Sequence, residues 1–197
     1  MNIKDELIKS VGAAEDIRLN DVEMNPLNVK AVMINEVVPF DSSNDFYGGA
    51  NADYMKTTIP LFQNAGLLVY SIDDILNLGI YITNAVKIPK TESAVDKSCI
   101  EKSLPYLEKE LSLFPNVRVI MLMGDVAKKS FNMISKKASK KNAVPAVSTY
   151  KLRGSEIFYR DMRIMPSYIM TGGNLLIEKS KSLMTSEDIA VMAELIK

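Results

Sequence analysis

The sequence contains no histidine and no tryptophan, and it has one cysteine in 197 residues. Without histidine, the chain cannot form a Ser-His-Asp triad, a Cys-His pair or a histidine-based zinc site. A single thiol excludes an internal disulfide and any metal or iron–sulfur site held by several thiolates. Any catalysis must therefore use carboxylates, lysine, tyrosine, hydroxyls, amides and backbone groups.

The chain also lacks a charge excess and a long hydrophobic run. Lys and Arg total 24, and so do Asp and Glu. The chain therefore has no overall positive charge to attract nucleic acid, although a local basic patch could still bind it. No apolar run approaches the ~18 residues of a membrane span. The charged start MNIKDELIKS is unlike a signal peptide. We therefore expect a cytoplasmic protein with no membrane partner.

Three glycine-containing motifs of common enzyme sites are missing as well. The sequence has no GxGxxG, no GxxxxGK[ST] and no GxSxG, so dinucleotide, P-loop and nucleophile-elbow sites are not expected. What is present is ordinary globular composition, with 47% hydrophobic and 24% charged residues. The length suits one domain over residues 1–197, able to bury about 70% of its unfolded surface.

The apolar pattern predicts strands that alternate with helices. Buried strands are expected at 29–35, 79–84, 117–123 and 156–165. Helices are expected at 2–11, 52–65, 72–78, 96–112 and 124–140, followed by a closing helix. Asn51 and Ser71 are the predicted N-caps of the second and third helices, and Thr185 or Ser186 that of the last.

This alternation predicts a three-layer α/β/α domain around a central, mainly parallel four-stranded sheet. In open α/β sheets, ligands bind at the carboxyl ends of the strands. We therefore expect the loops 36–50, 85–93 and 166–174 to converge on a site. These loops are also the richest in Gly, Pro, Asn and Asp.

Several segments between residues 30 and 175 follow a known order of motifs. NEVVP (35–39) stands where the pattern has GEAPG, DFYGGAN (45–51) where it has PFVGRAG, and YITNAVKIP (81–89) is close to YITNVVKCRP. SLPYLEKEL, NVRVIMLMGDVAKKSF and RGSEIFYRDMRIMPSYIM continue with a helix, a strand followed by LGxxA, and an HPxxxL-type loop. In these motifs the chain resembles the uracil-DNA glycosylase superfamily, most closely its family 4 branch.

The resemblance implies a uracil-DNA glycosylase-like fold and hydrolysis of the N-glycosidic bond of a flipped-out uracil or deaminated base in DNA repair. Phe46 matches the family's stacking phenylalanine, and Tyr47 is its neighbour should the register slip. Asn84 matches the asparagine that hydrogen-bonds the uracil edge. Glu36 matches a glutamate that orients water, and Asn35 beside it is expected to contact the substrate.

The iron–sulfur ligands of the family 4 branch are missing from this sequence. Ile88 and Ser103 stand where the resemblance would place two cysteines, and Cys99 lies four residues before the second position. We read Cys99 as a lone buried thiol. The sequence therefore predicts no metal cluster and no cofactor.

The histidine of the terminal motif is missing too, and Met165 takes its position. In the family this histidine donates to the uracil carbonyl as negative charge builds, and a thioether cannot donate. Losing one such donor typically costs ~3–4 kcal/mol, or ~10²–10³ in rate. Lys87, Asn84 or Ser167 is a candidate for a replacement donor.

DNA contacts are suggested by two features. Six lysines fall close together, at 128, 129, 136, 137, 140 and 141. We consider Lys136 and Lys137 as phosphate contacts, with a solvated helical face as the alternative. Met170 and the turn with Gly172 and Gly173 stand where the family has a strand-prising loop. The alternative there is a plain turn with Met170 packed inward.

Three functions remain open from the sequence. The first is a monomeric DNA glycosylase, acting on single-stranded or uracil-containing DNA. The second is a catalytically impaired member that binds a nucleobase, a nucleotide or a partner. The third is a related N-glycosidic hydrolase with a different small substrate. Phe46, Asn84 and Glu36 favour the first, whereas the absent histidine and the neutral charge favour the other two, so enzymatic turnover is left open.

Overall fold

The computed structural model describes residues 1–91 and 94–197. Its centre is a five-stranded sheet with the order β2-β1-β3-β5-β4. The strands are β1 (Ala31–Val37), β2 (Ile80–Val86), β3 (Val119–Met123), β4 (Ile157–Tyr159) and β5 (Met162–Ser167). All neighbouring pairs are parallel except β4 and β5. The predicted mainly parallel α/β sheet is confirmed, with five strands instead of four.

The extra strand arises because a hairpin replaces the single strand expected over 156–165. Tyr159 of β4 pairs with Met162 of β5, and the turn between them holds Arg160 at φ 54°. A left-handed turn is usually marked by Gly or Asn. Arg160 and Asp161 occupy it here, so no Gly or Asn marks the point at which the chain reverses.

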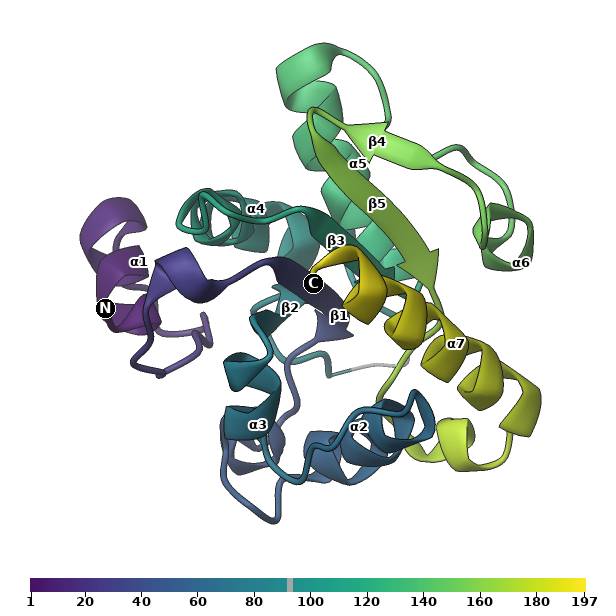
Figure 1. Cartoon of the computed structure of the whole chain (residues 1–197). Coiled ribbons are helices and arrows are strands. Elements are labelled where there is room, and N and C mark those ends of the chain that lie inside the picture. The colour runs from purple at the N-terminus through teal and green to yellow at the C-terminus, as the bar shows by residue number, and fades with distance from the viewer. Residues whose placement is uncertain (92–93) are drawn as a thin grey trace.

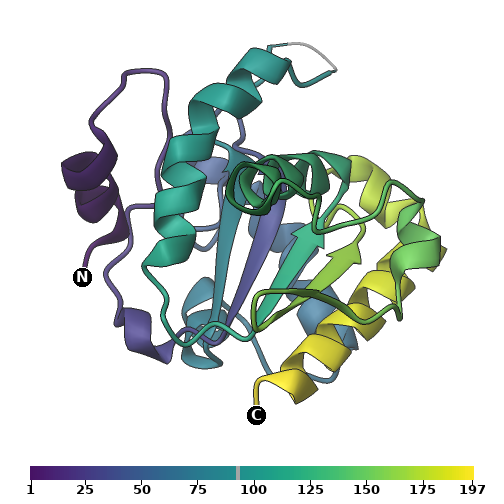
Figure 2. The ribbon, with the colours of Figure 1, turned by 90° about the horizontal axis from the view of Figure 1, so that it is seen from above.

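Helices cover both faces of the sheet (Figures 1 and 2). One face carries α4 (Lys97–Ser112) and α5 (Asp125–Ser139), with α1 (Ile3–Val11) packed beside α4. The other carries α2 (Asp53–Asn64) and α7 (Lys179–Leu195), with α3 (Ile72–Asn77) near β2. The short α6 (Thr149–Leu152) lies near β5, and its Leu152 packs into the core on the α4 and α5 side. This is the expected three-layer arrangement.

Side chains of each strand alternate between the two layers even though the strands are apolar throughout. In β1, Ala31 and Met33 join the core on the α2 and α7 side, whereas Val32 and Ile34 join the core on the α4 and α5 side. Burial on both faces explains the continuous apolar runs in the sequence. The same two-residue period decides which way the polar residues at the strand ends point.

Two of the predicted helix starts are wrong. Helix α2 begins at Asp53 after Ala52, without a side-chain cap, so Asn51 does not cap it. Helix α7 begins at Lys179, and Thr185 and Ser186 are buried inside it. The Thr185 hydroxyl donates to the carbonyl oxygen of Lys181 at 2.8 Å, which is how a threonine is tolerated within a helix.

The Ser71 cap is confirmed. The Ser71 hydroxyl accepts a hydrogen bond from the backbone N–H of Asp74, and the Asp74 carboxylate accepts one from the backbone N–H of Ser71.

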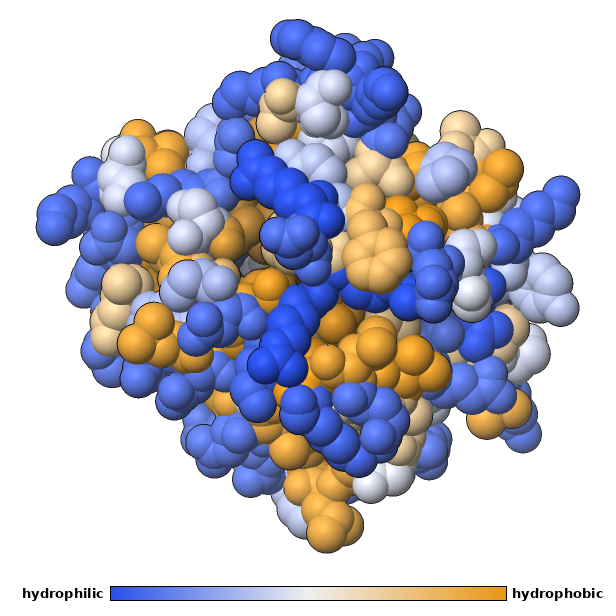
Figure 3. Space-filling view, turned by 45° about the horizontal axis from the view of Figure 1, so that its top comes forward, coloured by the Kyte–Doolittle hydropathy of each residue, from blue (hydrophilic) through white to orange (hydrophobic). Residues whose placement is uncertain are grey.

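On the face shown in Figure 3, blue hydrophilic side chains interrupt the orange hydrophobic ones. Within the described residues, no helix is both long and apolar enough to cross a membrane.

Candidate functional site

The parallel strands β1, β2, β3 and β5 end at one edge of the sheet, which we call the rim. Asn35 of β1 and Asn84 of β2 are register partners there. The Asn35 side-chain nitrogen donates to the Asn84 side-chain oxygen at 2.8 Å, and each residue exposes only 1% of its surface. These two residues form what we call the amide pair.

The loop after β1 brings a carboxylate and an aromatic ring to the amide pair. The Asn84 side-chain nitrogen donates to both carboxylate oxygens of Asp45, at 2.9 and 3.0 Å. The backbone N–H of Phe46 donates to the same carboxylate at 2.9 Å. The buried Phe46 ring lies 5.2 Å from the ring of Tyr54. Asp45 therefore links the Asn84 side chain to the backbone of Phe46.

The loop after β5 reaches the amide pair from the other side. The Thr171 hydroxyl donates to the Asn35 side-chain oxygen at 3.3 Å, and the carbonyl oxygen of Met170 accepts from Thr57 at 2.9 Å. The loops 36–50 and 166–174 thus converge at the rim as expected. The third loop, 85–93, includes residues 92 and 93, which lie outside the described part of the chain.

Glu36 points from β1 toward the start of α5. Its Oε2 atom accepts from the backbone N–H of Val126 at 2.6 Å and so caps a helix whose N-cap residue, Gly124, has no side chain. A Cβ atom at Gly124 would lie 2.8 Å from the Glu36 carboxyl carbon, so this position needs glycine. An internal carboxylate thus already lies at the positive end of α5, where an external anion would otherwise bind.

Burial raises the pKa of Glu36 above its usual value, and the hydrogen bond from Val126 opposes this shift only in part. Burial likewise raises the pKa of Asp45, against the hydrogen bonds from Asn84 and Phe46. The rim therefore holds two half-buried carboxyl groups whose charged forms are disfavoured. A carboxyl group with a raised pKa is a better proton acceptor near neutral pH.

Lys87 lies on the opposite side of the sheet from the amide pair. Its ammonium group donates to Thr83 and to Glu110, both at 2.6 Å. Tyr81 donates to Glu110 at 2.6 Å, and Asn20 donates to Tyr81 at 2.8 Å. We call these five residues the ionic cluster. The structure does not bring the Lys87 ammonium to the amide pair, because it is engaged in this cluster.

Met165 and Ser167, both in β5, also make their contacts away from the amide pair. Met165 pairs with Met121 in the sheet and packs into the core on the α7 side. It precedes Ser167 by two residues, or roughly 7 Å along the strand. The Ser167 hydroxyl donates to Asp188 at 2.6 Å, and Arg153 donates to the same carboxylate at 2.9 and 3.0 Å.

Tyr47 binds the outer edge of β2 rather than the amide pair. Its hydroxyl donates to the carbonyl oxygen of Ile82 at 2.9 Å and accepts from the N–H of Ile82 at 3.3 Å. Because β2 is at the edge of the sheet, these backbone groups would otherwise lack a strand partner. Tyr47 thus satisfies the sheet edge, and burial raises its pKa.

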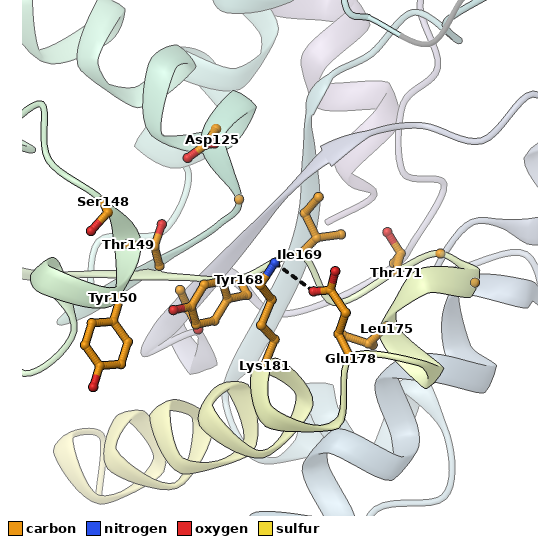
Figure 4. Close-up of a pocket in the computed structure, with 14 residues that line it drawn as sticks. Asp125, Ser148, Thr149, Tyr150, Tyr168, Ile169, Thr171, Leu175, Glu178 and Lys181 are labelled. Atoms are coloured by element: carbon orange, nitrogen blue, oxygen red, sulfur yellow. Dashed lines mark ion pairs between the residues drawn. The ribbon is translucent and has the colours of Figure 1, made fainter.

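A cleft of 590 Å³ opens at the rim beyond β3 and β5 (Figure 4). Thr171, Gly172 and Gly173 line it, as do Tyr168, which directly follows β5, and Lys181 of α7. The Lys181 ammonium pairs with Glu178 at 2.7 Å. Met170 does not line this cleft, because it is fully buried in the core. Thr171 thus joins the cleft to the amide pair.

A comparison with known families covers the residues of this rim. The family model of the uracil DNA glycosylase superfamily matches residues 35–176. The chain belongs to this superfamily. The matched range begins at Asn35 and contains Asp45, Phe46, Asn84 and Thr171. A comparison with curated proteins gives no match.

The lysines considered for DNA contact in this superfamily member lie far from the rim. Lys136 and Lys137 are in the last turn of α5, whose first residue is Asp125. Eleven residues of helix separate Asp125 from Lys136, which is roughly 17 Å. Lys137 pairs with Glu108 at 2.9 Å. A DNA contact at these lysines would require a DNA strand that extends from the rim to the other end of α5.

An iron–sulfur cluster does not fit this superfamily member, because the chain has a single cysteine. Ser103, at one of the expected ligand positions, is buried, accepts from the N–H of Lys87 at 2.8 Å and donates to the carbonyl oxygen of Cys99 at 2.7 Å. It therefore joins α4 to the end of β2. Cys99 is half-buried rather than buried. Within the described residues, no three His, Cys, Asp or Glu side chains gather as a metal site would need.

Sequence reasoning missed three residues of the rim: Asp45, Tyr54 and Thr171. Asp45 lies in a loop segment rich in Asp, Ser and Asn, so the sequence does not distinguish it from its polar neighbours. The Tyr54 hydroxyl donates to the carbonyl oxygen of Val37 at 2.7 Å, a contact between a helix and the end of β1. The sequence did contain one usable signal, since Thr171 directly precedes the Gly172–Gly173 turn of a loop expected at the rim.

Proposed function

We propose that this protein is a DNA glycosylase, which binds a base flipped out of DNA at the rim and hydrolyses its N-glycosidic bond. The observation that supports this most strongly is that one carboxylate, Asp45, accepts from the Asn84 side chain and from the backbone N–H of Phe46, so that these two residues belong to the same part of the rim. An aromatic ring and an amide are the groups that stack on a flipped base and bind its edge. Membership of the superfamily supports the same reading.

Glu36 is the proposed water-orienting group. It is the last polar residue of β1, one position after Asn35, and its pKa is raised by burial. A carboxylate in this state can accept a proton from attacking water. Its bond to Val126 holds the carboxyl group in place.

Turnover is expected to be slow. No histidine is available, and the side chain of Met165 is buried in the core. Without a donor to the leaving base, the rate is expected to be ~10²–10³ below that of a site with one. Met165 is buried and lies two residues before the end of β5. We therefore expect that Met165→His would not restore the rate.

The proposal is tested by single-turnover base release, with the protein in excess over an oligonucleotide carrying one modified or unpaired base. The panel comprises uracil, hypoxanthine, xanthine and cytosine. We expect slow release of at least one base and loss of release in Asn84→Ala. Absence of release of all four bases by the folded protein would contradict glycosylase activity.

A second candidate, base binding without hydrolysis, is favoured by a specific observation. Asn84 already uses its nitrogen on Asp45 and its oxygen on Asn35, and Phe46 is fully buried. A base must therefore displace internal contacts to enter. Binding that depends on Asn84, together with no release, would support this candidate.

A further inference from the structure

Glu36 and Ile169 meet at one point above Gly124. A Cβ atom at Gly124 would lie 2.8 Å from the Glu36 carboxyl carbon, 2.9 Å from the Oε2 atom of that carboxyl group and 2.8 Å from Cγ1 of Ile169. Gly124 directly follows β3, which lies between β1 and β5 in the sheet. The carboxyl group from β1 and the apolar side chain from the loop after β5 are therefore neighbours across the end of β3.

The backbone on both sides holds Ile169 in this place. The N–H of Gly124 donates to the carbonyl oxygen of Ser167 at 3.1 Å, which joins the end of β3 to the end of β5. Ser167 and Met170 are both buried, and the carbonyl oxygen of Met170 accepts from Thr57 at 2.9 Å. Ile169 therefore lies on a short segment that is fixed before it and after it.

Ile169 lies between Glu36 and the cleft. The described residues that line the cleft include Ile169 and Gly124 but not Glu36 (Figure 4). Ile169 exposes 41% of its surface, whereas Glu36 is half-buried. An isoleucine side chain has no hydrogen-bond donor, so the carboxyl group loses water on this side without gaining a partner in return.

We propose that Ile169 is a positioning residue for Glu36: its side chain covers the carboxyl group on the cleft side and keeps bulk water away from it. The cover follows from the contact above Gly124, whereas its use in hydrolysis rests on the proposed function. A poorly solvated carboxylate accepts a proton more readily from the one water molecule that it meets beside a bound substrate.

The charged groups around Glu36 oppose one another. Burial has the largest influence on the pKa of Glu36 and raises it, and the hydrogen bond from Val126 lowers it. Of the charged neighbours, Asp125 raises this pKa, whereas Lys90 and Lys128 lower it. Lys128 is paired with Asp125 at 2.7 Å. The cover over the carboxyl group is therefore the feature to vary.

The test measures the pKa of Glu36 from the chemical shift of its carboxyl carbon during a pH titration. In Ile169→Ala, water reaches the carboxyl group, so this pKa should fall toward the ordinary value for glutamate. Ile169→Val keeps a branched apolar side chain and should keep most of the raised pKa. Ile177→Ala is the matched control, because Ile177 is exposed and does not line the cleft, and it should leave the pKa of Glu36 unchanged. Circular dichroism verifies that all three variants are folded.

A second readout connects the cover to hydrolysis. The rate of single-turnover base release should rise with pH through the pKa of Glu36, because the charged carboxylate is the proton acceptor. In Ile169→Ala this rise should move to lower pH. The plateau rate should fall by a few-fold, well short of the ~10²–10⁴ that loss of a general base costs.

The outcomes separate the cover from the proposed function. An unchanged Glu36 pKa in folded Ile169→Ala, or an equal fall in Ile177→Ala, would overturn the role of Ile169. A fall in Ile169→Ala alone, with no base release by any variant, would support the cover and contradict the glycosylase proposal. Base release whose rise with pH stays in place in Ile169→Ala would overturn the use of the cover in hydrolysis.

Discussion

Two buried polar clusters share strand β2, and alternate residues of the strand belong to each. Asn84 faces the α2 and α7 side and belongs to the amide pair, whereas Tyr81 and Thr83 face the α4 side and belong to the ionic cluster. The ionic cluster is closed, with Lys87 and Glu110 both buried. The amide pair ends at two half-buried groups, Asp45 and Thr171.

We infer from this difference a structural role for the ionic cluster, and it supports the proposed functional role of the amide pair. In the ionic cluster, the lysine, the carboxylate and two hydroxyls bond to one another out of reach of solvent. In the amide pair, hydrogen bonds lead from buried amides to side chains that a ligand can reach. Buried polarity alone therefore does not identify the site. What identifies it is the connection to the rim.

The largest expected effect comes from breaking the ionic cluster. Lys87→Ala removes one partner of a buried ion pair and leaves Glu110 charged and unpaired, which should lower the free energy of unfolding by about 3–5 kcal/mol. Urea denaturation measures this change. Lys137→Ala, which breaks the exposed pair with Glu108, is the control and should cost about 0–1 kcal/mol. Similar losses in the two variants would show that the cluster is not closed.

A matched pair of asparagine variants sharpens the comparison. Asn84→Ala removes one hydrogen-bond partner from Asp45 and one from Asn35, and Asn20→Ala removes one from Tyr81 in the ionic cluster. Each should lose about 1–3 kcal/mol of stability. Only Asn84→Ala should also lose base-dependent DNA binding, measured by anisotropy at a temperature where both variants are folded. Loss of binding in Asn20→Ala to the same degree would contradict separate roles.

Glu36→Ala should have a smaller effect on stability. It removes the carboxylate that caps α5 and leaves the N–H of Val126 without this acceptor, which should cost about 1 kcal/mol. Glu36→Gln keeps an oxygen acceptor and should cost less. If Glu36→Gln proved as destabilising as Glu36→Ala in urea denaturation, the bond to Val126 would not be the reason.

Asp45→Asn is expected to have the smallest effect, with the opposite sign. The folded-state pKa of Asp45 is raised by burial, so the folded state binds this proton more tightly than the unfolded state. Stability therefore falls as pH rises from the unfolded pKa through the folded pKa. Asp45→Asn should be more stable than wild type at neutral pH, and the gain should shrink at acidic pH. A gain that grows on acidification would show that the pKa is lowered instead.

Much of the fold follows from the sequence, because β1, β2 and β3 are apolar runs separated by helical patterns. The hairpin at Arg160 does not follow, since no Gly or Asn marks its turn. The start of α7 was also missed, because EKSKSLMTSED lacks an apolar period at its beginning.

The part of the site that lies at the strand ends could be predicted from the sequence. The part that depends on the path of a loop could not. Asn35 and Asn84 end neighbouring strands, so their meeting follows from parallel pairing. Lys87 is three residues after Asn84, and the two-residue period of a strand already places it on the opposite face. Asp45 reaches the amide pair only through the path of its loop, which no local pattern specifies.

The most direct test of the rim as the base-binding site is nuclear magnetic resonance of the side-chain amides during titration with a single-stranded oligonucleotide. Binding at the rim should shift the side-chain NH₂ signals of Asn84 and Asn35, while that of Asn20 in the ionic cluster stays in place. Saturable binding that leaves the Asn84 and Asn35 signals unmoved would contradict this placement of the site.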